Sequence, residues 1–114
     1  MTAVPPWKKI VLEQLELLAS EAEQMEYETK VPHVDITREL VDGWFSDSYH
    51  PNDSIFTGCF SEGEFAVLSE FNRQFEQALT ILPPSKGTVG NWLQSPEWRH
   101  VMVQAARARQ EIAG

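Results

Sequence analysis

The sequence predicts an all-α protein, a compact helical bundle-like domain of four to five helices. Apolar residues recur at intervals of three and four along most of the chain, as on the buried face of an amphipathic helix. Capping residues and prolines stand at the ends of these stretches. No stretch of useful length alternates apolar and polar residues as a strand does. The 114 residues fit a single domain, 1–114.

The first predicted helix covers residues 6–29 and is either continuous or broken near Ser20. Its apolar stripe consists of Trp7, Val11, Leu15, Leu18, Ala22 and Met25. Ser20 and Glu23 have the spacing of a capping box, which favours the break. The segment ends at Val31, because the residue before a proline avoids helical geometry.

A second helix is predicted over residues 35–45, with Asp35 as its N-cap. Its inner face consists either of Ile36, Leu40 and Trp44 or of Leu40, Val41, Trp44 and Phe45. Residues 46–60 have no periodicity, and turn-forming residues dominate their first half. We therefore expect a loop here, in which residues 55–57 could form a short extended piece.

The helix over residues 61–82 has the clearest boundaries. Ser61 and Glu64 match the capping box, and Pro83 and Pro84 end the apolar stripe. Together with the neighbouring helices, this stripe predicts a core of Leu15, Leu18, Leu40, Leu68, Phe71, Phe75, Trp98 and Met102.

The last helix is predicted over residues 95–112. Ser95 suits the N-cap, and Pro96 suits the first helical position. Its inward-facing residues are predicted to be Trp98, Val101, Met102, Ala105 and Ala106. The segment before it, which carries Trp92 and Leu93, is expected to be a loop or short turn.

The charge is strongly asymmetric along the chain. Residues 13–76 contain fifteen Asp or Glu against three Lys or Arg, whereas the whole chain has a net charge of −8. An acidic surface favours basic partners and repels nucleic acids and anionic membranes. No apolar run approaches the roughly 18 residues of a membrane span. The single Cys59 and the lack of a secretory signal favour a reduced, cytoplasmic protein.

Three sets of residues could carry chemistry, but none has the spacing of a known site. Four polar residues of the 46–60 segment have oxygen or imidazole ligands for a metal: Asp47, His50, Asn52 and Asp53. Cys59 could pair with His50 as a nucleophile, and Glu97 with His100 resembles half of a di-iron motif. The favoured interpretation is turn chemistry, a small buried cysteine and an exposed helix surface. We therefore expect no enzyme, no metal and no cofactor.

Acidic residues beside loop aromatics are typical of a surface that binds a basic protein. The predicted partner-binding residues are Glu23, Glu26, Asp47, Tyr49, His50 and Asp53. The alternative for the loop aromatics is that they close the ends of the bundle. Two other functions remain open: a metal-binding or enzymatic protein that uses residues 47–59, and a homodimer joined through a helix stripe.

Two segments carry a resemblance to a known family. They are the acidic helix Glu21-Ala-Glu-Gln-Met-Glu-Tyr-Glu28 and the segment Asp47-Ser-Tyr-His-Pro-Asn-Asp53. In size, charge and these segments the chain resembles bacterial immunity proteins, small cytoplasmic inhibitors of toxin domains. The second segment is similar in character to the acidic, Tyr-Pro-containing recognition region of helical colicin immunity proteins. The resemblance implies a basic toxin or nuclease as the partner.

Overall fold

The computed structural model describes residues 6–82 and 89–113, and all of the regular structure in these residues is helical. Five long helices and two short ones follow one another along the chain: α1 (Trp7–Ala19), α2 (Glu21–Lys30), α3 (Ile36–Phe45), α4 (Ser54–Thr57), α5 (Glu62–Leu79), α6 (Val89–Leu93) and α7 (Pro96–Ala113). The prediction of an all-α fold is confirmed.

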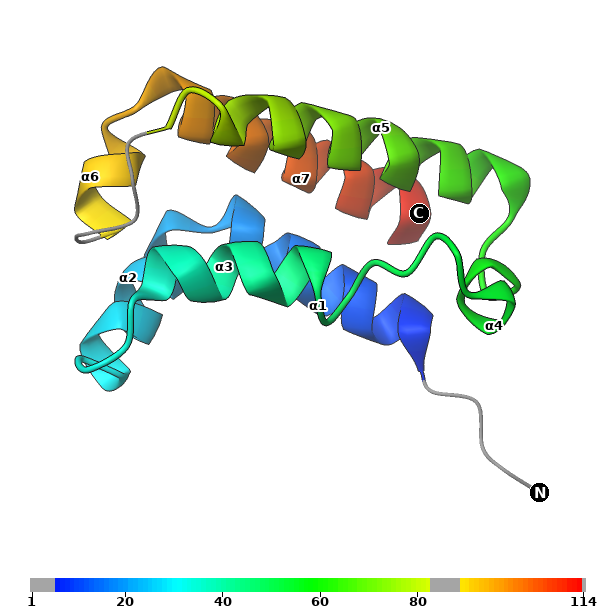
Figure 1. The fold of residues 1–114 in the computed structure, drawn as a ribbon, viewed down its shortest axis with the longest axis horizontal. Helices are drawn as coiled ribbons and strands as arrows, with labels where there is room; N and C mark the ends of the chain where they lie inside the picture. Colours follow the sequence, from blue (N-terminus) through cyan, green and yellow to red (C-terminus); the bar gives the residue numbers. More distant parts are fainter. Residues whose placement is uncertain (1–5, 83–88, 114) are drawn as a thin grey trace.

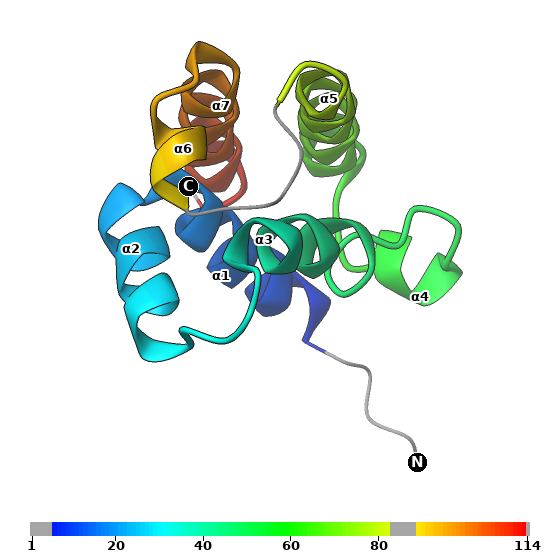
Figure 2. The same ribbon diagram turned by 60° about the vertical axis from the view of Figure 1, so that its left-hand side comes forward.

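The long helices form two layers (Figure 1, Figure 2). Helices α5 and α7 run antiparallel to each other in one layer, and α1, α2 and α3 form the other. The most extensive contacts between elements are those of α7 with α1 and with α5, so α7 joins the two layers. Helix α2 lies at one end of the long axis of the molecule and α4 at the other.

The break near Ser20 is confirmed, and polar groups satisfy the backbone there. Ser20 has an extended backbone and accepts a hydrogen bond from the Glu23 amide at 3.1 Å. The buried Gln24 amide donates to the Leu17 and Leu18 carbonyls, both at 3.1 Å. These two carbonyls lie in the last turn of α1, where an α-helix leaves its acceptors without intrahelical partners.

The break also corrects the predicted stripe of residues 6–29. Ala22 and Met25 are exposed, whereas Gln24 is fully buried. The chain changes direction at Ser20, so the three-and-four spacing of α1 does not continue through α2. In α7, Ala106 was predicted to face inward and is exposed instead.

The capping box at Ser61 is present in full. The Ser61 hydroxyl accepts from the Glu64 amide at 3.1 Å, and the Glu64 carboxylate accepts from the Ser61 amide at 2.8 Å. Helix α5 ends at Leu79 rather than at residue 82; Thr80 follows as the C-cap residue, and its hydroxyl donates to the Gln77 carbonyl at 2.7 Å. Pro83 and Pro84, the predicted stop, lie outside the described residues.

The two short helices were not predicted. Residues 55–57, expected to be extended, belong to α4, whose N-terminus is capped by the Asp53 carboxylate. Trp92 and Leu93, expected in a loop or turn, belong to α6. Four or five residues are too few to show helical periodicity, so neither helix has a recognisable pattern.

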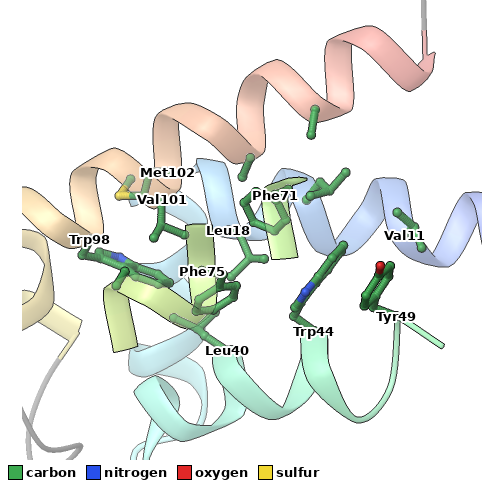
Figure 3. Close-up of a cluster of buried hydrophobic side chains, with 14 of the residues drawn as sticks. Val11, Leu18, Leu40, Trp44, Tyr49, Phe71, Phe75, Trp98, Val101 and Met102 are labelled. Atoms are coloured by element: carbon green, nitrogen blue, oxygen red, sulfur yellow. The ribbon is translucent and has the colours of Figure 1, made fainter. Parts of the chain in front are cut away.

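All eight residues predicted for the core are buried. Figure 3 shows side chains from α1, α3, α5 and α7 meeting in one cluster, among them Leu18, Leu40 and Phe75. Phe75 contacts the rings of Phe45 and Trp98, with centroids 4.9 and 5.8 Å away. The core therefore lies between the two layers and holds them in one body.

Candidate partner-binding surface

Tyr49, predicted as an exposed anchor for a partner, belongs to the core. It is 7% exposed, and its ring stacks on that of Trp44 with centroids 5.2 Å apart (Figure 3). Its hydroxyl shares a hydrogen bond with the Ser69 hydroxyl at 3.2 Å. The burial corrects the prediction, because a ring enclosed in this way cannot contact a partner unless the fold opens.

The neighbouring residues His50 and Asp53 have local structural roles. The His50 ring is half-buried and lies against Trp7 and Phe56, at centroid distances of 4.7 and 5.8 Å. Asp53 accepts hydrogen bonds from the Ile55 and Phe56 amides of α4. Among the four predicted residues of this segment, Asp47 alone is exposed and has no hydrogen bond or ion pair with any residue that the structure describes.

Glu23 and Glu26, the other two predicted residues, lie on α2. Glu26 forms an ion pair with Lys30 at 2.6 Å, and the hydrogen bond from Lys30 holds the pKa of Glu26 below its ordinary value. The Glu23 carboxylate has no partner in the described residues. Both line a shallow hollow of about 310 Å³ beside Tyr27. Glu23 and Glu26 lie on α2 at one end of the long axis, whereas Asp53 caps α4 at the other end, so the six predicted residues do not form one surface (Figure 1).

The candidate metal and catalytic residues have local contacts within the described part of the chain. In residues 6–82 and 89–113, no group of three His, Cys, Asp or Glu side chains could hold a metal ion. Cys59 is half-buried, and its thiol donates to the Ile55 carbonyl at 3.3 Å. Glu97 accepts from the Ser95 hydroxyl at 2.7 Å, which lowers the pKa of Glu97, and His100 is exposed.

The acidic residues divide into those with partners and those without. Within residues 6–82 and 89–113, six ion pairs join Lys8 to Glu64, Lys9 to Glu13, Lys30 to Glu26, Arg38 to Asp42, Arg73 to Glu70 and Arg99 to Glu21. Six exposed carboxylates have neither a hydrogen bond nor an ion pair with any described residue: Glu16, Glu23, Glu39, Asp47, Glu62 and Glu111. They are spread over α1, α2, α3, α5, α7 and the segment after α3, so negative charge remains on several faces.

Sequence reasoning missed a groove between α5 and α7. The groove consists of two adjoining hollows of about 360 and 470 Å³, and Gln74 lines both of them. Small residues on both helices leave this space open: Ala66, Ala78 and Ala108. The Gln74 side-chain oxygen is buried without a hydrogen-bond partner in the described part of the chain. The alanines were visible in the sequence, but only the packing of α5 against α7 brings them together.

Comparisons of the chain with models of known protein families, with curated proteins and with solved structures find no match. None of the helices in the described residues combines the length and the apolar character needed to cross a membrane.

Proposed function

We propose that this protein is a small, acidic, non-catalytic binding module that associates with a basic protein and inhibits it, as an immunity protein neutralises a toxin domain. The observation that carries the proposal is the set of six exposed carboxylates without partners in the described residues. Each of them adds to a negative field that internal pairing does not cancel. Such a field attracts a positively charged protein before contact and orients it.

The ion pairs support the view that the acidic residues do something other than stabilise the fold. Exposed ion pairs contribute little stability, typically below about 1 kcal/mol each. An excess of like charge destabilises the compact state through self-repulsion. The stability of the domain therefore gives no reason for a net charge of −8, whereas a basic partner does.

The partner is to be captured from the native cell, and its association measured at two salt concentrations. A triple variant, Glu23→Gln, Glu39→Gln and Asp47→Asn, removes three of the unpaired charges and retains side-chain size. We expect association with the captured basic protein to slow by up to about tenfold at low salt, with a smaller change in dissociation. The matched control exchanges the acids at the same positions, Glu23→Asp, Glu39→Asp and Asp47→Glu, and should associate at the wild-type rate.

Inhibition is measured in the same experiment. The activity of the captured protein should fall to zero at one equivalent of this chain. A partner with a neutral or acidic surface, or an association rate that responds neither to salt nor to the triple variant, would contradict the proposal. Turnover of a small substrate that depends on Cys59 or His50 would replace it with an enzymatic function.

A further inference from the structure

The groove between α5 and α7 has the shape of a docking site for a helix. Its two hollows follow α5 from Ala66 to Ala78, continue to Ile81 just beyond that helix, and follow the antiparallel α7 from Glu111 to Pro96. Phe71, Ala78 and Ala108 line the groove and also belong to the core cluster, so the groove borders the packing between the two layers.

The floor of the groove is apolar. It includes the buried residues Phe71, Ala78 and Ala108, and Ile81 extends it at one end. Ile81 is 63% exposed, the highest value among the exposed large hydrophobic residues. Apolar side chains of an incoming helix would be removed from water on this floor, which is the main source of affinity when a helix binds in a groove.

The polar groups around the floor favour a ligand that carries hydrogen-bond donors and positive charge. Buried polar atoms are nearly always hydrogen-bonded, and among the residues that the structure describes the Gln74 side-chain oxygen has no donor. Glu70, Glu97 and Glu111 line the groove; Glu70 is paired with Arg73, and the other two carboxylates face one lining Arg or Lys among the described residues, Arg107. The hydrogen bond from Arg73 lowers the pKa of the Glu70 carboxyl to about 2, and the same ion pair offsets the charge of Glu70, so the negative charge available to a ligand comes from Glu97 and Glu111.

From these features we infer that the α5–α7 groove is the docking site for a cationic amphipathic helix of the partner, an inference that rests on the proposed function. Leucine-like side chains of that helix would lie on the apolar floor, and its lysine or arginine side chains would reach the flanking carboxylates and the Gln74 oxygen. A second copy of this chain fits less well, because it also carries a net charge of −8. Like charges brought face to face oppose association.

The first test uses a synthetic helical peptide of leucine and lysine, about 18 residues or five turns long. It is titrated into the isotope-labelled full chain, with a leucine–glutamate peptide as the negative probe. We expect the cationic peptide to shift the methyl signals of Ala66, Ala78 and Ala108, and the anionic peptide to shift none of them. Shifts confined to other faces would overturn the inference.

A matched pair of variants tests the groove itself. Ala66→Arg places a bulky positive side chain in the groove, whereas Ala106→Arg makes the same change on an exposed part of α7 that does not line it. We expect Ala66→Arg to weaken binding of the peptide and of the captured partner by at least about tenfold, and Ala106→Arg by less than about twofold. Circular dichroism verifies that both variants are folded. Equal weakening of binding by the two variants would mean that binding depends only on net charge, and would overturn the inference.

The two arginines near the end of α7 provide a second matched pair of variants, in which the change in the groove is expected to strengthen binding rather than weaken it. Arg107 and Arg109 are both exposed and have no partner in the described residues, but only Arg107 lines the groove. Arg107→Gln should strengthen binding of the cationic peptide more than Arg109→Gln does, because it removes a like charge from the site. An equal gain in both variants would overturn the inference.

Failure of the groove and failure of the proposed function give different results. If only the groove is wrong, the captured partner still associates in a salt-sensitive manner, and Ala66→Arg and Ala106→Arg behave alike. If the proposed function is wrong, association is insensitive to salt in the wild type and in both variants. Self-association of the chain that Ala66→Arg abolishes would assign the groove to a homodimer and overturn the inference.

Discussion

Individual polar side chains connect the helices of this protein to one another. Gln24 is the clearest case, because it is fully buried and uses both ends of its amide. Its nitrogen donates to the Leu17 and Leu18 carbonyls of α1, and its oxygen accepts from the Trp98 indole of α7 at 3.0 Å. One side chain of α2 therefore connects the end of α1 to the opposite layer.

Replacing Gln24 with leucine should lower the free energy of unfolding by about 3 kcal/mol, because the buried Trp98 indole and two backbone carbonyls lose their partners. Urea denaturation measures the change. Gln110→Leu, at an exposed position of α7, controls for the change in composition. A loss below about 1 kcal/mol at Gln24 would mean that water replaces the amide.

At the scale of the element, capping groups set the helix boundaries. Ser61 and Glu64 act within one turn of each other, so the start of α5 could be predicted from the sequence. Helix α6 is different. The Glu28 carboxylate of α2 accepts from the Val89 amide at 2.6 Å and satisfies a donor of the first turn of α6. Sixty-one residues separate this donor and acceptor in the sequence, so no local motif reveals the contact.

Ser61→Ala should destabilise the protein by about 1 kcal/mol, because the amide of Glu64 loses its acceptor in the first turn of α5. Chemical denaturation is the appropriate measurement. Ser46→Ala serves as the control, because Ser46 is exposed and its side chain caps no helix. An unchanged stability in Ser61→Ala would show that the first turn of α5 is satisfied by solvent.

For the whole molecule, two ion pairs join different helices. Lys8 of α1 pairs with Glu64 of α5 at 2.8 Å, and Arg99 of α7 pairs with Glu21 of α2 at 2.9 Å. The hydrogen bond from Lys8 is the main reason why the pKa of Glu64 lies below its ordinary value of 4.5. A carboxylate with a lowered pKa in the folded state stabilises the fold when it is ionised.

We expect part of the stability of the protein to be lost as the pH falls below 4.5, when Glu64 becomes protonated. The contribution is fully present above the unfolded-state pKa and disappears as the pH passes through the lower pKa of the folded state. Glu64→Gln retains the capping geometry but removes the charge. Its free energy of unfolding, measured by urea denaturation at about pH 7 and about pH 3, should therefore fall less than that of the wild type. Glu62→Gln, at a neighbouring exposed carboxylate without a partner in the described residues, is the control. Parallel pH profiles for wild type and Glu64→Gln would contradict the prediction.

The candidate surface was much harder to predict than the fold. Asp47 and Glu23 are exposed as expected, but Tyr49 is buried against Trp44, and Asp53 caps α4. An aromatic residue in an aperiodic segment has no neighbour in the sequence that indicates whether its ring is covered. That depends on the position of α5, which supplies the Ser69 partner of the Tyr49 hydroxyl.

The sequence by itself determined the helical class, four long helical segments and the eight core residues, and the capping box at Ser20 favoured the break that divides the first segment into α1 and α2. Each of these depends on spacings of three or four residues or on a cap within one turn, and such short-range signals are complete in a local stretch of chain. Only the tertiary structure decided the burial of Gln24 and Tyr49, the position of α6 and the groove between α5 and α7. These features arise where segments distant in the sequence pack together, and the geometry of that packing is not encoded in any one of them.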